Sequence, residues 1–515
     1  MLEYTCQRRS VLNIFTVTFL IFLIAVFVIY WLIDARYRYI WLLVSGLAYY
    51  AYMCPRGMAF LLYIIAISYL TAHLMTRKNR TLYFVVGLTA TIAPLIIFKA
   101  LGLFFETGLE VVGSSFFILL AAGYIIDVYR GVSDAEQNPG KYALFVSFFP
   151  IVSSGPIERS TGLLKQIHEG AAFDEALARK GINRILRGLF MKCLIADRVG
   201  TIVNAAYGNI EGSSGATLLL AALLYSIQLY ADFAGYSNIA IGIGNLFGFE
   251  IAENFRQPFF STDTSEFWRR WHMTLGVWFK EYFFYPLLRT PLHSAIQNAL
   301  NKALGHGGDA KNSSGRGGDA KKAKKRAKMI STYAAMFALW FTVGLWHGIS
   351  LNYVIGPGLL QWVYIVCEES LAEPYKKLWT KVKIDPEGKV LKCLRRIRTY
   401  LLFCIAMVFF RSADLPSAMS IFGNIFTKFD LRSTIMSRSF LGPMPLWRFG
   451  LLIVEIIVLF AYETLREREI SISGILAKKS RFGRWCFYLA ICVIIIIGLI
   501  YNSGSDPSTF IYARF

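Results

Sequence analysis

An apolar run of 23 residues without a charge, from Val11 to Ile33, constrains the fold of this chain more than any other feature. As a helix it would cross the roughly 30 Å hydrocarbon core of a bilayer. It is too long for the apolar region of a signal peptide, and no small-residue cleavage site accompanies it. The 515 residues are 56% hydrophobic and 17% charged, whereas soluble domains average roughly 25% charged. The sequence therefore predicts a membrane protein.

Similar apolar segments recur along the whole chain. They begin near Tyr39, Met58, Leu82, Val111, Tyr142, Ala216, Met329, Thr399, Phe449 and Gly483. Unpaired backbone groups are too costly in lipid, so we expect an all-α polytopic protein of about ten to twelve transmembrane helices. Gly155-Pro156, Gly242 with Gly244, and Gly356-Pro357-Gly358 interrupt these segments, and they favour re-entrant pieces of non-helical backbone.

The net charge of +21 comes from 54 Lys and Arg against 33 Asp and Glu. In a soluble protein it would suggest nucleic-acid binding, but here the basic residues flank apolar runs, where they anchor spans to anionic lipid. The densest group lies in residues 301–328, where Gly307-Gly-Asp-Ala-Lys311 recurs as Gly317-Gly-Asp-Ala-Lys321. This low-complexity composition predicts a disordered, basic cytoplasmic loop, either a solvated linker or a docking site for an acidic partner. It separates residues 1–100 and 101–300 from residues 329–515.

The segment from Ser261 to Tyr282 has the pattern of an amphipathic helix lying at the membrane interface. Asp263 and Glu266 have the spacing of a capping box at its start. One stripe is aromatic and apolar, and it comprises Trp268, Trp271, Leu275, Trp278, Phe279 and Tyr282. His272 lies beside the edge of this stripe, and the periodicity alone leaves both a structural and a functional histidine open.

His347 and Asp232 are ionisable residues inside apolar runs. His347 stands between Gly344 and Gly348, in Gly344-Leu-Trp-His-Gly348, and a histidine titrates in the range that suits proton transfer at neutral pH. An ionisable group at membrane depth is a functional candidate, although a buried histidine can also simply join helices. Asp232 could relay protons or hold an ion, or it could bond to Tyr236, Ser237 or Asn238 and shape the core.

Motifs for bound metals and nucleotides are absent from the sequence. The eight cysteines form no CxxC or Cys/His ligand pattern, and there is no P-loop, HExxH pair or GxSxG elbow. We therefore expect no metal site and no permanently bound cofactor.

Four motifs together resemble the membrane-bound O-acyltransferase (MBOAT) family. They are Phe148-Phe-Pro-Ile-Val-Ser-Ser-Gly-Pro-Ile-Glu-Arg159, Tyr230-Ala-Asp-Phe-Ala-Gly-Tyr-Ser237, Phe267-Trp-Arg-Arg-Trp-His-Met-Thr-Leu275 and Gly344-Leu-Trp-His-Gly348. The chain is similar to the bacterial branch that serves alginate O-acetylation and teichoic-acid D-alanylation, from about Leu101 to its end. The resemblance implies helices around a central tunnel, and it assigns catalytic roles to His347 and His272.

The resemblance also implies a reaction. An acyl group, acetyl or D-alanyl, would pass from a cytoplasmic thioester, acetyl-CoA or an acyl carrier protein, across the bacterial cytoplasmic membrane. The acceptor would be a hydroxyl of an extracellular polysaccharide or an extracytoplasmic esterase-like partner acyltransferase. Pro286-Leu-Leu-Arg289 replaces the usual Pro-Leu-Gly-Gly turn, which leaves the acceptor polymer open. A transporter or flippase is the alternative of another class, but we find none of the internal repeats that transporters carry.

Overall fold

The computed structural model describes residues 17–77, 79–104, 111–305, 316–383, 385, 387–470 and 472–502. In these residues the backbone forms helices and turns without a strand, which confirms the predicted all-α class. The chain divides into two compact units. Unit 1 comprises Met1–Phe260, Arg270–Thr274 and Pro416–Phe515, and unit 2 comprises Ser261–Arg269 and Leu275–Leu415.

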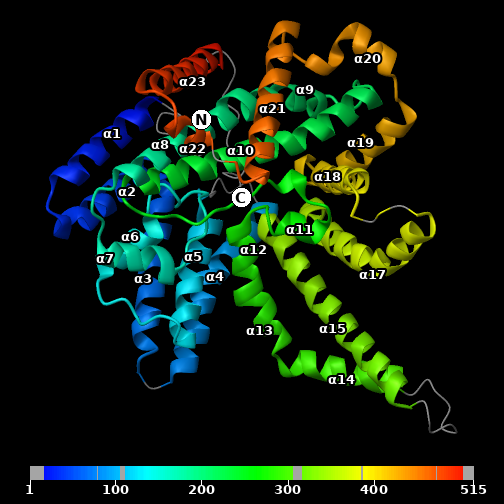
Figure 1. Cartoon of the computed structure of the whole chain (residues 1–515). Helices are drawn as coiled ribbons and strands as arrows, with labels where there is room; N and C mark the ends of the chain where they lie inside the picture. Colours follow the sequence, from blue (N-terminus) through cyan, green and yellow to red (C-terminus); the bar gives the residue numbers. More distant parts are fainter. Residues whose placement is uncertain are drawn as a thin grey trace. The chain divides into compact units, whose positions relative to one another are not determined.

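Unit 1 holds most of the helices. They are α1 (Val17–Leu32), α2 (Arg38–Met53), α3 (Met58–Leu74), α4 (Arg80–Phe104), α5 (Ser114–Arg130), α6 (Pro139–Ser147), α7 (Lys165–Glu169), α8 (Glu175–Leu189), α9 (Asp197–Gly208), α10 (Gly215–Leu246), α19 (Leu415–Thr427), α20 (Leu431–Ser437), α21 (Leu446–Glu467), α22 (Ile472–Ala477) and α23 (Arg481–Asn502). Helices α3, α4 and α5 pack side by side, as the blue and cyan ribbons of Figure 1 show. A π-helical turn, η6 (Phe190–Ala196), joins α8 to α9.

Helix α10 is apolar on every side, as expected of a helix surrounded by protein. In its most apolar window 78% of the residues are buried, against 17% for α4. The sequence suggested an interruption at Gly242 and Gly244, and this expectation is wrong because α10 continues through both glycines to Leu246. They serve close packing instead: a Cβ at Gly242 would lie 2.6 Å from the carbonyl oxygen of Gly181 on α8.

Unit 2 is built around α15 and a π-helical turn. Its helices are α11 (Thr264–Trp268), most of α12 (Met273–Phe279), α13 (Tyr285–Leu288), α14 (Pro291–Gly305), α15 (Arg316–His347), α16 (Leu351–Tyr353), α17 (Leu360–Lys381) and α18 (Lys389–Arg411). The π-helical turn η9 (Val354–Leu359) contains Gly356-Pro357-Gly358 and continues directly into α17. Its glycines let α15 and α18 approach, because Cβ atoms at Gly358 and Gly356 would lie 3.0 Å from Trp340 O and 2.6 Å from Ala406 O.

The described parts of the basic segment 301–328 are helical. Residues 301–305 end α14, and residues 316–328 form the first part of α15, so the expected disorder is wrong for these residues. Alanine, lysine and arginine have high helix propensity, and the segment Ala320–Lys328 consists of these residues alone and runs directly into an apolar helix. Residues 306–315, which include the first Gly-Gly-Asp-Ala-Lys repeat, lie outside the described residues.

Five helical stretches in the described part of the chain are long and apolar enough to cross a bilayer. They are Pro55–Leu74, Arg80–Ala100, Gly215–Leu246, Lys321–His347 and Arg481–Gly498, and Thr18–Leu32 is a shorter apolar helix. This is fewer than the predicted ten to twelve spans. Helices α2 and α5 have only 16 and 17 residues, and α21 contains several charged residues.

Candidate functional site

His272 lies at a break between two short helices. The sequence predicted one amphipathic helix in the segment from Ser261 to Tyr282, and this continuity is wrong: α11 ends at Trp268, and α12 begins at Met273. His272 has a φ of 43°, a left-handed conformation that few residues other than glycine adopt and that cannot continue a right-handed helix. The predicted cap is confirmed, because the Asp263 carboxylate accepts from the Glu266 N–H at 2.6 Å.

Five of the six residues of the predicted aromatic stripe are buried in the protein, and Trp268 is half-buried. Trp268 donates its indole N–H to Gln361 Oε1 at 3.0 Å within unit 2. In unit 1, Trp271 is 2% exposed and packs against Phe255 and Tyr230. The break at residues 269–272 thus separates side chains that one continuous helix would align.

The His272 ring, itself 2% exposed, lies among aromatic and amide groups of unit 1. The Phe233 ring meets it edge-on at a centroid distance of 4.6 Å, and Phe116 stacks at 6.2 Å. The ring nitrogen Nδ1 lies 3.0 Å from the side-chain oxygen of Asn254. These contacts restrain both the tilt and the rotation of the imidazole.

His347 is the last residue of α15 and is 4% exposed. The Phe410 ring of α18 meets it edge-on at 5.3 Å, and the Trp346 ring lies at 4.8 Å. These two aromatic rings restrain the orientation of the imidazole.

The surroundings of His347 in unit 2 are fixed by hydrogen bonds from a buried side-chain amide and by close backbone packing. Asn352, which is 1% exposed, donates its side-chain amide to Phe409 O at 3.2 Å and to Ser412 O at 2.8 Å. These bonds hold the end of α18, which carries Phe410. Gly344 and Gly348 leave no space for a side chain, since a Cβ would lie 2.9 Å from Val354 Cα and 2.3 Å from the Tyr353 ring respectively.

Asp232, the third sequence candidate, forms an ion pair with a residue that sequence analysis missed. Its carboxylate accepts from Lys192 Nζ at 2.6 Å, and Lys192 also contacts Asp197 at 2.8 Å. The expected partners near Asp232 in sequence bond elsewhere: Tyr236 pairs with Ser153, and Asn254 donates to Ser237. One signal could have revealed Lys192, since it is the lone charge in the apolar run Phe190–Ala196.

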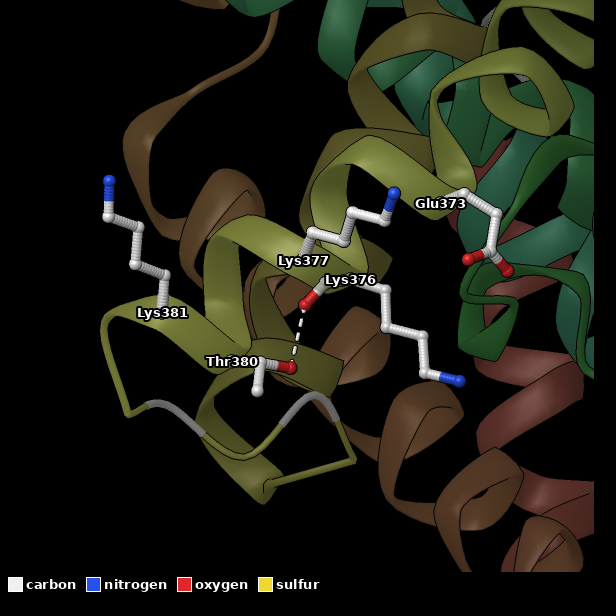
Figure 2. Close-up of a pocket in the computed structure, with 5 residues that line it drawn as sticks. All are labelled: Glu373, Lys376, Lys377, Thr380 and Lys381. Carbon is white, nitrogen blue, oxygen red and sulfur yellow. Dashed lines mark hydrogen bonds between the residues drawn. The ribbon is translucent and has the colours of Figure 1, made fainter.

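A surface groove on α17 is basic but lacks a convergent binding geometry. It is lined by Glu373, Lys376, Lys377, Thr380 and Lys381. Figure 2 shows the lysine side chains extending in different directions, with Thr380 bonded back to the Lys376 carbonyl oxygen at 2.9 Å. Ammonium groups that diverge cannot hold one anion together, so this groove is a solvated helix face.

The candidate histidines belong to different units, His272 to unit 1 and His347 to unit 2. Comparison with known proteins places one of them in a recognised domain. Residues 137–300 match MBOAT, the membrane-bound O-acyltransferase family. The chain carries an MBOAT domain. It contains His272, Asn254, Asp232 and Lys192, whereas His347 lies beyond its matched end.

Curated relatives extend the similarity beyond the MBOAT domain. The chain is 30% identical over 354 residues to a probable alginate O-acetylase AlgI of Pseudomonas syringae pv. tomato, which is 69% of this chain and 57% of the relative. It is 26% identical over 435 residues to a peptidoglycan O-acetyltransferase of Helicobacter pylori, covering 78% and 74%. It is 26% identical over 301 residues to a teichoic acid D-alanyltransferase of Bacillus subtilis, covering 58% and 68%. The chain thus spans little more than half of the first of these relatives.

Proposed function

We propose that this protein is a membrane-bound O-acyltransferase that acylates hydroxyl groups of a cell-surface polymer. The observation that carries the proposal is the MBOAT domain at residues 137–300, together with these three relatives, each named as an acyl-transferring enzyme. An acetyl group is favoured because the two O-acetylation relatives match 69% and 78% of this chain, against 58% for the D-alanyltransferase.

The proposed chemistry begins at His347. Its imidazole takes the proton of the acceptor hydroxyl as the oxygen attacks the thioester carbonyl of the acyl donor. The carbon–sulfur bond then breaks, and the departing thiolate receives the proton from the imidazolium. General-base help of this kind contributes roughly 10² to 10⁴ in rate, and orientation of the reactants supplies much of the remainder.

His272 has a second role in the proposal, as a residue that binds and orients a substrate or the arm of the acyl donor. Its ring is restrained by Phe233 and Asn254, which suits a group that must present a nitrogen in a fixed direction. The donor is a thioester of CoA or of a carrier protein, reached from the cytoplasmic side of a multi-pass protein in the cell membrane. The acyl group passes either to the polymer itself or to an extracytoplasmic partner acyltransferase.

The experiment compares surface polymers by mass spectrometry in cells that lack the chain and in cells that carry the wild type or a variant. We expect His347→Ala to abolish acylation at normal membrane abundance. The matched control is His293→Ala on α14, because His293 has no role in the proposal. Ester-linked acetyl groups would support O-acetylation, and D-alanyl esters would support the alternative suggested by the teichoic acid relative. Unchanged acylation in His347→Ala would refute the assigned base.

A further inference from the structure

Asn254 forms several side-chain hydrogen bonds around His272, more than a residue that only packs in the core requires. It is fully buried, at 0% exposed. Its side-chain oxygen faces His272 Nδ1 at 3.0 Å and Thr274 Oγ1 at 2.9 Å, and its amide nitrogen donates to Ser237 Oγ at 3.2 Å. We infer that Asn254 is a positioning residue that holds His272 as the Nδ1–H tautomer, so that Nε2 carries the lone pair. The inference rests on the proposed function for the role of His272.

The backbone of Thr274 fixes which way the Asn254 amide points. Its N–H can only donate, and it lies 3.4 Å from the same Asn254 oxygen. The opposite orientation would set the Asn254 amide nitrogen, also a donor, against that N–H. The Thr274 hydroxyl accepts from the Ile157 N–H at 3.0 Å and directs its own proton to Asn254. Because the oxygen faces His272, the ring must donate from Nδ1.

Backbone bonds from the same segment hold His272 in its uncommon conformation. The N–H of Met273 donates to the Asn254 carbonyl at 2.9 Å, and the N–H of Arg256 donates to the Arg270 carbonyl at 2.9 Å. His272 therefore lies between two backbone hydrogen bonds to residues 254–256, the segment that contains Asn254. A residue other than glycine with a φ of 43° persists only when its surroundings fix it. Asn254 thus controls the position of the ring through its backbone and the tautomer through its side chain.

The tautomer has a chemical consequence because a neutral imidazole has one donor and one acceptor nitrogen. With Nδ1–H bonded to Asn254, Nε2 can accept a proton or a hydrogen bond from a substrate. With the other tautomer, the same nitrogen could only donate. When the partner that sets the tautomer of a catalytic histidine is altered, rate can fall by orders of magnitude.

Tautomers can be read directly from ¹⁵N-histidine NMR of the full chain in lipid bilayers, without any substrate. The His272 signals are identified as those lost in His272→Gln among the six histidines. We expect the Nδ1–H signature in the wild type and in Asn254→Asp, whose carboxylate still accepts. We expect it to give way to Nε2–H or a mixture in Asn254→Ala. The matched control is Asn245→Ala, which removes another buried amide of unit 1.

Acylation of the surface polymer gives the second readout. We expect Asn254→Ala to lower the initial rate at least about tenfold, Asn254→Asp to restore part of it, and Asn245→Ala to leave it unchanged. In Asn254→Asp the pH dependence of the acylation rate should also shift to higher pH, because a carboxylate beside His272 stabilises the charged form of its ring.

The outcomes separate this inference from the proposed function. An Nε2–H signature in the wild type, or wild-type tautomer and rate in Asn254→Ala, would overturn the role of Asn254. Absence of acyl transfer by the wild type would instead refute the proposed function and leave the NMR result standing. If Asn254→Ala does not fold, the wild type and Asn254→Asp still decide the tautomer.

Discussion

At the scale of single residues, the buried lysine of unit 1 sets a clear stability test. Lys192 is 2% exposed and lies between Asp232 at 2.6 Å and Asp197 at 2.8 Å. Removing one partner of a buried ion pair leaves an uncompensated charge, at a cost of roughly 3–5 kcal/mol. We expect Lys192→Met to lower the thermal stability of the detergent-solubilised protein accordingly. Adding Asp232→Asn should recover part of the loss, and strictly additive effects in this double-mutant cycle would argue against the pair.

A second test at this scale concerns a carboxylic acid in the buried turn after α6. Burial raises the pKa of Glu158 to about 7, against the opposing hydrogen bonds from the Ala252 and Arg159 amides. The folded state therefore binds a proton more tightly than the unfolded state. The resulting stabilisation is complete below the unfolded pKa of about 4.5 and is lost as pH rises through about 7.

We therefore expect Glu158→Gln to change the pH dependence of unfolding. The wild type should lose thermal stability between pH 5 and pH 8 relative to the variant, by a free energy on the order of 3 kcal/mol. Glutamine keeps an oxygen for the Ala252 N–H, which Glu158 accepts at 2.6 Å. Parallel melting curves across this pH range would contradict the raised pKa.

At the scale of elements, two glycine pairs bring α8 and α10 together. Cβ atoms at Gly181 and Gly188 would lie 2.6 Å from Gly242 O and 2.5 Å from Gly235 O. Along α8 the glycines advance by seven residues, from 181 to 188, while their partners on α10 fall back by seven, from 242 to 235. The two helices are therefore antiparallel. Paired small residues let helix backbones approach closely in membrane proteins. The amphipathic helix α8 is thereby held against the helix that carries Asp232.

We expect Gly188→Ala to destabilise the protein by roughly 1–3 kcal/mol, because the added methyl group would overlap the backbone of α10. The control is Gly208→Ala at the end of α9, where a Cβ would meet no atom within 4 Å. Melting temperatures of the two variants in the same detergent provide the measurement. Equal stability of both would show that the close approach is not needed.

The same elements show what the sequence could and could not predict. Composition and apolar runs were sufficient for the all-α class, and the spacing of Asp263 and Glu266 located the start of α11 correctly. The break after Trp268 was missed because the aromatic period continues through it. Backbone hydrogen bonds between residues 270–273 and residues 254–256 interrupt the helix. Helical periodicity does not encode such a contact between separate segments.

Sequence also left the environment of the candidate site open. His272 and His347 were found through motifs. His347 was expected at membrane depth, whereas His272, expected at the edge of an interfacial helix, is also buried in protein. Asn254 gave no comparable signal, because an asparagine in a loop near Pro258 is ordinary. Its function depends on three-dimensional contacts with Ser237 and Thr274. Lys192 gave a signal as a lone charge in an apolar run, but its pairing with Asp232, 40 residues away in sequence, could not be read from it.

At the scale of the whole molecule, the helix that ends in His347 provides a test of topology. The 32 residues of α15 extend about 48 Å at 1.5 Å per residue, which exceeds a hydrocarbon core of roughly 30 Å. We therefore expect its exposed lysines, among them Lys324, to lie outside the core, whereas Val343, at 6% exposed, is buried in the protein. Basic segments beside a span stay on the cytoplasmic side.

We expect the Lys324→Cys variant to react with a membrane-impermeant maleimide in inverted vesicles but not in intact spheroplasts. The eight native cysteines must first be replaced by serine, since Cys367, Cys393 and Cys486 are exposed. Lys324→Cys is compared with Val343→Cys, which should stay unlabelled in both preparations because its surroundings exclude the reagent. Labelling of Lys324→Cys from the outside would reverse the orientation of α15. The cytoplasmic placement of the basic end of α15 would then be wrong, and with it the orientation assumed for the helix that carries His347.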